Sequence, residues 1–357
     1  MSAILAAKRT GVVPRGGAFA RLEIEDLAAP VVQALLAAAG ITAGAVDELI
    51  CANALGAGGN PARRVALAAG LPERVAGLSV DRQCAGGLDA VLLARALVDS
   101  GAAEVVIAGG VESYSRRPIR LRSDPGGGPA VVYDQARFTP WPDRDPGMAE
   151  AAAALAARLG IARAAQDAWA VASHAKARVC AGEIVALAGV ERDVFARGLS
   201  LAVAARAKVL TGTITAANAA VAADAAAFVL VVSDRIAAGR GLRIVGGATL
   251  GGDPVEPGLA PVAAIAAALQ RAGVAADQVA AAEVMEAYAA QAIACLTGAG
   301  LDAAVVNIGG GALARGHPIG ASGAVLAVRL FHELQAGIGL AAIAAAGGIG
   351  TALVVQK

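Results

Sequence analysis

The sequence predicts an α/β fold made of two similar halves, with a segment of different character between them. Helical and strand patterns alternate along the chain, as they do in layered α/β domains. The stretch 40–46 is echoed at 273–279, and Ala108-Gly109-Gly110 is echoed by Ala346-Gly347-Gly348. The short repeat period of a solenoid is missing from the sequence, so these echoes indicate one duplicated α/β unit.

The composition agrees with a large packed core. The chain has 357 residues, of which 57% are apolar and 17% charged, and its mean hydropathy is +0.63. Only 3% are aromatic, and small aliphatic residues suit tightly packed buried strands. The net charge of +1 offers nucleic acid no electrostatic attraction, so we expect no nucleic-acid partner.

The elements of the two halves follow from apolar runs that end at glycine. In the first half the patterns predict a helix over 30–39, a strand over 48–55, a helix over 87–100 and a strand over 104–108, with Gly109-Gly110 turning out of that strand. In the second half they predict helices over 261–272 and 322–336 and a strand over 341–345.

The segment between the halves is rich in Pro, Gly and charge over 115–146. That composition is typical of an excursion from the core, and we expect a lid or an oligomer loop. Helices are predicted over 148–159 and 163–181, and a return to strand and helix over 213–234, with an apolar strand at 227–232.

The longest uncharged window, 334–356, is long enough to cross a membrane. Its five glycines break it into a helix end, a strand and a turn, so we expect no membrane span. The start of the chain lacks the apolar core of a signal peptide, and we expect a cytoplasmic protein.

Four cysteines are spread far apart and form no C-x-x-C pair. This spacing argues against a zinc site and against a disulfide framework, so we expect no bound metal and four reduced thiols.

Cys84 is the first candidate catalytic residue. It follows a predicted strand, at a glycine turn, directly before the helix predicted at 87–100. The N–H groups and partial positive charge of a helix N-terminus favour the nucleophilic thiolate. The alternative is a small buried cysteine near a turn.

His317 is the second candidate. It lies between Gly316 and Pro318, just before the helix predicted at 322–336. A histidine held there can take a proton from a thiol and then donate a hydrogen bond to a developing oxyanion. The alternative is a capping or structural histidine.

Two further segments, 284–291 and 344–350, would each be assigned to the core if taken alone. Together with the Cys84 and His317 motifs they resemble the thiolase family of acyl-CoA acyltransferases, which includes acetyl-CoA acetyltransferases and 3-ketoacyl-CoA thiolases. Matching stretches at 60–63, 108–113, 215–219 and 253–254 extend the resemblance over nearly the whole chain.

The resemblance implies a thiolase fold, in which two similar halves, each with a five-stranded mixed sheet, stack as an αβαβα sandwich. It divides the chain into an N-terminal half of 1–114 plus 210–237, an inserted loop domain of 115–209 that binds coenzyme A, and a C-terminal half of 238–357. It also implies a homodimer or homotetramer, a coenzyme A thioester as substrate with no further cofactor, and a place in fatty acid metabolism.

Carried over residue by residue, Cys84 matches the nucleophile that becomes acylated. His317 matches the histidine that activates it and lines an oxyanion hole, and the backbone N–H of Cys84 contributes to a second such hole. Ala220 and Gly347 match substrate-binding positions.

Four positions depart from the family pattern. The family has a second cysteine, an acid/base, at Ala344, and an asparagine that orders a water at Met285. It commonly has serine at Ala220, and a glycine at Ala346. The stretch 174–213 is also shorter than usual, which trims the loop domain.

The loss at Ala344 is the largest in chemical terms. A positioned acid/base is worth about 10²- to 10⁴-fold in rate, and one oxyanion donor about 3 kcal/mol. We therefore expect an acyltransferase whose Cys84 can be acylated and whose second half-reaction is weakened or altered. Glu286 is a candidate substitute base, with structural support as its alternative, and we assign Cys295 to the core.

Two other functions stay open. One is a decarboxylative condensing enzyme, which needs no base for the α-proton, and the other is a non-catalytic coenzyme A-binding subunit. The basic side chains of Arg116, Arg117, Arg120 and Arg122 suit coenzyme A phosphates, a neighbouring subunit or a solvated loop face.

Overall fold

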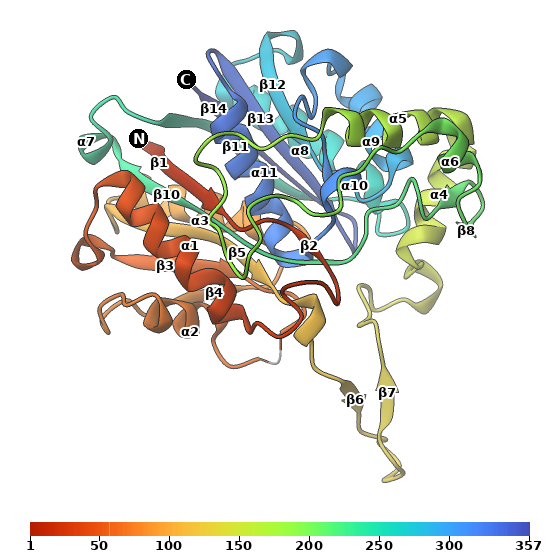
Figure 1. The fold of residues 1–357 in the computed structure, drawn as a ribbon, viewed down its shortest axis with the longest axis horizontal. Helices are drawn as coiled ribbons and strands as arrows, with labels where there is room; N and C mark the ends of the chain where they lie inside the picture. The colour runs from red at the N-terminus through yellow and green to blue at the C-terminus, as the bar shows by residue number, and fades with distance from the viewer. Residues whose placement is uncertain (57) are drawn as a thin grey trace.

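The computed structural model describes residues 1–56 and 58–357, and its main feature is one twisted sheet that runs through both halves (Figure 1). The first half contributes, in spatial order, β4 (Leu78–Val80), β3 (Glu48–Ala52), β5 (Val105–Glu112), β10 (Ala223–Ser233) and β1 (Ser2–Arg9). β3 is parallel to β4 and β5, and β10 is antiparallel to β5 and β1.

The second half repeats this arrangement with β12 (Val279–Val284), β13 (Ile338–Ala345), β14 (Ile349–Gln356) and β11 (Leu242–Gly251). β12 is parallel to β13, and β14 is antiparallel to β13 and β11. Where the first half has β4, the second has one parallel bridge between Ala282 and Val306. The halves join through two residue pairs between β1 and β11.

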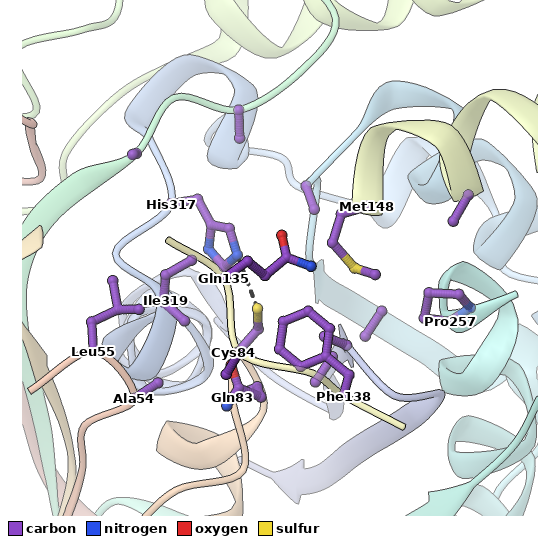
Figure 2. A pocket seen from close by; sticks show the side chains of 18 of the residues that line it. Ala54, Leu55, Gln83, Cys84, Gln135, Phe138, Met148, Pro257, His317 and Ile319 are labelled. Atoms are coloured by element: carbon purple, nitrogen blue, oxygen red, sulfur yellow. Dashed lines mark hydrogen bonds between the residues drawn. The ribbon is translucent and has the colours of Figure 1, made fainter. Parts of the chain in front are cut away.

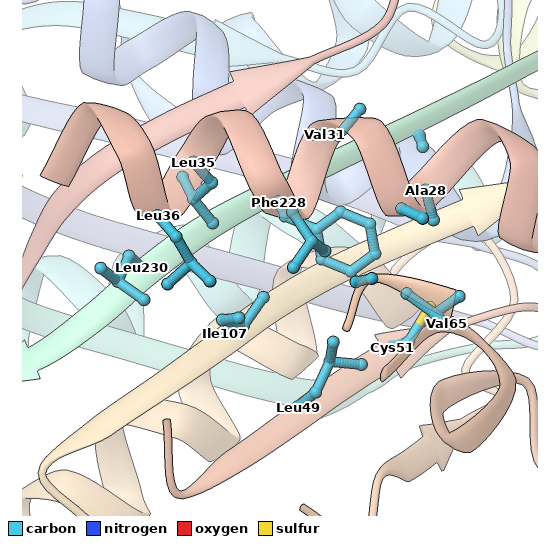
Figure 3. Close-up of a cluster of buried hydrophobic side chains, with 14 of the residues drawn as sticks. Ala28, Val31, Leu35, Leu36, Leu49, Cys51, Val65, Ile107, Phe228 and Leu230 are labelled. Atoms are coloured by element: carbon cyan, nitrogen blue, oxygen red, sulfur yellow. The ribbon is translucent and has the colours of Figure 1, made fainter. Parts of the chain in front are cut away.

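Three apolar clusters show the five layers of the sandwich. α1 (Ile24–Ala39) and α2 (Pro61–Ala68) cover the outer face of the first half (Figure 3). α3 (Gly86–Asp99) and α11 (Ile319–Glu333) lie between the two half-sheets, and α8 (Ala260–Ala272) and α9 (Ala289–Ala299) cover the outer face of the second half. The predicted αβαβα sandwich is confirmed.

The segment between β5 and β10 contains the elements that have no counterpart in the second half. A hairpin of β6 (Arg120–Arg122) and β7 (Val131–Tyr133) extends away from the core (Figure 1). After it come α4 (Met148–Arg158), α5 (Arg163–Lys176), α6 (Leu201–Ala205), β8 (Val209–Thr211) and β9 (Ile214–Thr215). In the second half, β13 passes directly into β14 through the turn Ala346-Gly347-Gly348.

The predicted echo of 40–46 at 273–279 is confirmed. Gly40 and Gly273 end α1 and α8 in the left-handed conformation, with φ of +68° and +67°. Short 3-10 helices then follow at Ala43–Ala45 and Ala276–Gln278. A left-handed residue closes the last helical turn, and glycine adopts that conformation without strain.

Several predicted boundaries are wrong; for example, the helix predicted over 163–181 ends at Lys176, and the strand predicted over 48–55 ends at Ala52. The helix predicted from residue 30 begins at Ile24 and contains Pro30, because a continuous buried face of apolar side chains offsets the one hydrogen bond that proline cannot donate. Gly109 and Gly110 do not turn out of the sheet, since β5 continues to Glu112. A Cβ on Gly109 would lie 2.8 Å from Cα of Phe228, so these glycines permit close contact inside the layers.

Candidate active site

Cys84 and His317, which are far apart in the sequence, meet in space. The Nε2 atom of His317 lies 3.1 Å from the Sγ atom of Cys84 (Figure 2). This is hydrogen-bond distance for a thiol and an imidazole, so a proton can pass directly between them.

The duplication of the fold explains this meeting. Cys84 stands two residues before α3 and His317 two residues before α11, and α3 and α11 are the equivalent inner helices of the two halves. The helices approach closely because glycines face backbone at their contact. A Cβ on Gly87 would lie 2.6 Å from the backbone N of Ala324 and 2.9 Å from the carbonyl O of Gly320.

A tight corner presents the Cys84 side chain to the cavity. The preceding residue, Gln83, has a φ of +48°, which is uncommon for a residue with a side chain. The Asp81 carboxylate accepts hydrogen bonds from the backbone N of Gln83 at 2.9 Å and from its Nε2 at 3.1 Å. The Asp81 side chain thus stabilises the strained corner.

The resting pair is a neutral thiol and a neutral imidazole. Removal from water raises the pKa of the Cys84 thiol to about 12; the charge of Glu112 adds to the increase, and the backbone N–H groups of Cys84 and Ala346 oppose it. Burial lowers the pKa of His317 to about 4. The sequence-based expectation that the helix N-terminus favours a thiolate is therefore wrong for the resting protein, because burial outweighs it.

Ser322 orients the imidazole from the other side. Its Oγ lies 2.6 Å from Nδ1 of His317. When Ser322 accepts a hydrogen bond from Nδ1–H, the lone pair of Nε2 faces Cys84 and can accept the thiol proton. Sequence reasoning missed this role, although Ser322 stands five residues after His317 in the same motif.

The pair opens into a cavity of about 410 Å³. Its walls come from both halves and from the segment between them. Apolar side chains form much of the surface, including Leu55, Phe138, Met148, Leu155, Pro257 and Ile319 (Figure 2).

Three of the four departing positions line this cavity, namely Ala220, Ala344 and Ala346. Gly347 lies next to it with a φ of +81°, and a Cβ there would be 3.2 Å from the carbonyl O of Phe138. Met285 is instead 1% exposed in the apolar cluster between the half-sheets, and is not part of the cavity wall.

Glu286 is buried away from the cavity wall, and its carboxylate is fully occupied. One oxygen accepts from Nε1 of Trp169 at 3.0 Å and Nδ2 of Asn307 at 2.8 Å. The other accepts from Oγ of Ser173 at 2.7 Å and the backbone N of Leu313 at 3.2 Å. These contacts favour the structural role, since a carboxylate bound to four donors has little capacity left to act as a base.

Cys295 is completely buried, with its Sγ 2.9 Å from the carbonyl O of Gly258, as assigned to the core. Of the basic run, Arg117 and Arg120 line the cavity. Arg116 instead forms an ion pair with Glu23, and Arg122 lies over the ring of Tyr133.

Glu112 is a further residue that sequence reasoning missed. Its carboxylate is 1% exposed and accepts four hydrogen bonds, from Nδ2 of Asn53 and from the backbone N atoms of Ala54, Leu55 and Gly320. Removal from water raises its pKa to about 7. A charged residue after two glycines inside a buried strand is the sequence signal that points to it.

Within residues 1–56 and 58–357, no group of three or more His, Cys, Asp or Glu side chains is placed to hold a metal ion. In the same described residues, no helix combines the length and apolar character that crossing a membrane requires.

The chain matches two family models in succession. Residues 2–235 match "Thiolase, N-terminal domain" and residues 241–357 match "Thiolase, C-terminal domain". A protein of Bacillus subtilis, described as "Putative acetyl-CoA C-acetyltransferase YhfS", is 40% identical over 99% of this chain and 98% of the relative. A protein of the same description from Staphylococcus aureus, VraB, is 34% identical with the same coverage.

A solved structure shows the same likeness in three dimensions. The crystal structure of the Bacillus anthracis acetyl-CoA acetyltransferase superimposes with a TM-score of 0.90 at 31% identity, over 99% of this chain and 98% of that one. The sandwich, the family models and these relatives agree, and the chain belongs to the thiolase family.

Proposed function

We propose that this protein is an acyl-CoA C-acyltransferase of the thiolase type, which carries the acyl group on Cys84. The observation that supports this most directly is the 3.1 Å distance between Sγ of Cys84 and Nε2 of His317 in the wall of the cavity. The names of the relatives, which refer to acetyl-CoA, support a coenzyme A thioester as the substrate.

In the first half-reaction, Nε2 of His317 takes the thiol proton as Sγ of Cys84 attacks the thioester carbonyl. A new C–S bond forms on Cys84, and the bond between the carbonyl carbon and the coenzyme A sulfur breaks. The proton on His317 then passes to the departing coenzyme A thiolate. A resting neutral pair suits this sequence, because the base is free and the thiol is not ionised before the substrate arrives.

The oxyanion that forms in this step needs hydrogen-bond donors. The backbone N–H groups of Cys84 and Ala346 stabilise the thiolate form of Cys84, so they are suited to stabilise an oxyanion on the adjacent carbon. Ala346 replaces a family glycine but keeps its backbone N–H, so this donor survives the substitution.

The second half-reaction is the weaker one in this proposal. Ala344 lines the same cavity as Cys84 and His317, and its methyl group can neither accept nor donate a proton. Met285 supplies no amide to hold a water. Making or breaking a carbon–carbon bond is therefore expected to be about 10²- to 10⁴-fold slower than it would be with an acid/base at position 344.

A decarboxylative condensation is the second candidate, and Ala344 favours it. Loss of CO₂ from a malonyl thioester generates the carbanion without a base for the α-proton. Condensation with malonyl-CoA but not with acetyl-CoA alone would select this reaction. The close thiol–imidazole contact makes a purely non-catalytic subunit the least supported of the three functions.

The surroundings of the site support three lesser proposals. Arg117 and Arg120 are suited to coenzyme A phosphates. The hairpin exposes the apolar side chains of Leu121, Val131 and Val132, which suits a homodimer or homotetramer. All four cysteines are free, which suits a cytoplasmic enzyme, and a coenzyme A thioester as substrate suits a place in fatty acid metabolism.

Isotope exchange tests the proposal. The wild-type protein should exchange labelled coenzyme A into acetyl-CoA, since exchange needs only the first half-reaction, while thiolysis of acetoacetyl-CoA lags behind it. Cys84→Ser and His317→Ala should lose most of the exchange. A folded wild-type protein that shows no exchange above the Cys84→Ser background would contradict the proposal.

A further inference from the structure

Glu112 connects three parts of the cavity wall. It ends β5 of the first half, and its carboxylate oxygens accept from the 53–55 segment and from the start of α11. Ala54, Leu55 and Ile319, which adjoin these contacts, all line the cavity. One buried carboxylate thus ties together two pieces of backbone that come from different halves of the chain.

The contact with α11 lies close to the imidazole. Gly320 follows His317 by three residues, and its backbone N donates to Oε2 of Glu112 at 3.0 Å. That N–H belongs to the first turn of α11 and has no acceptor within the helix. A Cβ on Gly320 would lie 3.0 Å from the same carboxylate oxygen, so the glycine allows the close approach.

We propose that Glu112 is a positioning residue for the Cys84–His317 pair. Its carboxylate fixes the start of α11, and so His317, against the 53–55 segment, and its negative charge adds to the larger effect of burial in opposing a Cys84 thiolate. The inference rests on the proposed function, because it assigns Glu112 a part in the same acyl transfer.

The charge of Glu112 acts on a small set of neighbours. The titratable and charged groups around it are Cys51 on β3, Asp81 and Cys84 before α3, His317 before α11, Arg120 on the hairpin and Asp224 on β10. The guanidinium of Arg120 contacts the carbonyl O of Ala54. All four hydrogen-bond donors to the carboxylate are neutral amides, so the negative charge is not cancelled by a direct cation.

Alkylation of Cys84 by iodoacetamide, measured by peptide mass spectrometry, reports the charge separately from the acyl transfer. In the intact protein, Glu112→Gln should react about tenfold faster at pH 8, because removing a nearby negative charge lowers the pKa of the thiol. Its acetyl-CoA exchange should fall about tenfold, since the new amide N–H₂ faces backbone N–H groups and breaks at least one of the four contacts.

Two variants separate the effect of the Glu112 charge from that of its hydrogen bonds. Glu112→Asp keeps the charge and shortens the side chain, so alkylation should stay near the wild-type rate while exchange falls. Glu283→Gln is the matched control. Glu283 is also 1% exposed, and burial also raises its pKa to about 7, but it faces Arg315 and Arg329. This control should leave the alkylation rate of Cys84 unchanged.

The proposal is overturned if, in folded Glu112→Gln, Cys84 is alkylated at the wild-type rate or acetyl-CoA exchange proceeds at the wild-type rate.

If Glu112→Gln does not fold, the pH profile of Cys84 alkylation in the wild type decides. Between about pH 6 and 8, the alkylation rate should rise less than tenfold per pH unit, because Glu112 gains its charge over that range. A full tenfold rise throughout contradicts the proposal. If the wild type shows no exchange, the proposed function fails, and the alkylation results still decide whether the charge of Glu112 acts on Cys84.

Discussion

At the scale of single residues, the site combines a thiol–imidazole pair with an alanine at the position where the family has an acid/base. Cys84 and His317 are in hydrogen-bond contact, while Ala344 presents only a methyl group to the same cavity. The chemistry that the chain retains is proton transfer between sulfur and nitrogen. The chemistry that it lacks is a second acid/base at position 344 of the cavity wall.

Restoring that group should restore the second half-reaction. Ala344→Cys is expected to raise the rate of acetoacetyl-CoA thiolysis by about 10²-fold or more, because a positioned acid/base contributes that much. Ala152→Cys, which adds a thiol to the cavity from α4, serves as the control and should change thiolysis little. Equal thiolysis in the two variants would mean that Ala344 does not limit the reaction.

His317 should remain neutral far below the usual pH of a histidine. Burial lowers its pKa to about 4, so its ring should be uncharged at pH 5 to 7 and gain a proton only as the pH falls through about 4. NMR of labelled histidine rings, with His317→Gln to assign the signal, measures this titration. A His317 signal that titrates near 6.5 would show that the imidazole is not desolvated as described.

At the scale of elements, the contact between α3 and α11 brings Cys84 and His317 together. A Cβ on Gly87 would meet backbone atoms of Ala324 and Gly320, and these cannot move aside as a flexible side chain can. Gly87→Val is expected to separate the two helices, destabilise the fold by about 1–3 kcal/mol and reduce exchange more than coenzyme A binding.

Urea unfolding and the exchange assay measure the two effects of Gly87→Val. Gly251→Ala is the control, because a Cβ at Gly251 meets no atom within 4 Å and its φ is not positive. Wild-type exchange in Gly87→Val would show that the helix contact does not set the alignment of Cys84 and His317.

The sequence identified these elements better than it identified their contacts. Glycine-terminated helices at 30–39 and 261–272 were predictable because a left-handed glycine is a local signal. The continuation of β5 through Gly109-Gly110 was not predictable, because those glycines pack against Phe228 and the start of α11, which lie far away in the sequence. The contact between Glu112 and Gly320 was missed for the same reason, since a hydrogen bond between halves leaves no local pattern.

At the scale of the whole molecule, buried ion pairs join the segment between β5 and β10 to both halves. Arg9 on β1 binds Glu183 and Asp193, with the Nε–Oε1 distance to Glu183 at 2.6 Å. Arg329 on α11 also binds Glu183, as well as Glu333. All of these side chains are nearly or completely buried, so each charge depends on its partners.

Breaking this network should destabilise the entire fold. Arg329→Met removes one of the two cations paired with Glu183 and one of the two paired with Glu333, and is expected to cost about 3–5 kcal/mol in the free energy of unfolding, measured in urea. Arg64→Gln, which breaks the exposed pair with Glu25, should remain within error of the wild type. Equal stability of the two variants would show that these charges do not hold the segment between β5 and β10.

The whole-molecule architecture was predictable chiefly because the chain is duplicated and resembles a known family. The sandwich follows from that resemblance, whereas the division at 1–114 plus 210–237, 115–209 and 238–357 stays a prediction. The reduction of one edge strand to the Ala282–Val306 bridge could not be foreseen, since a single bridge carries no strand-length pattern.

Peptide mass spectrometry of the protein after incubation with acetyl-CoA tests the central claim most directly. One acetyl group should appear on Cys84, should be removed by added coenzyme A, and should form far more slowly in His317→Ala. If Cys84 stays unmodified in a folded protein that binds coenzyme A, the thiol and imidazole are neighbours without being a catalytic pair.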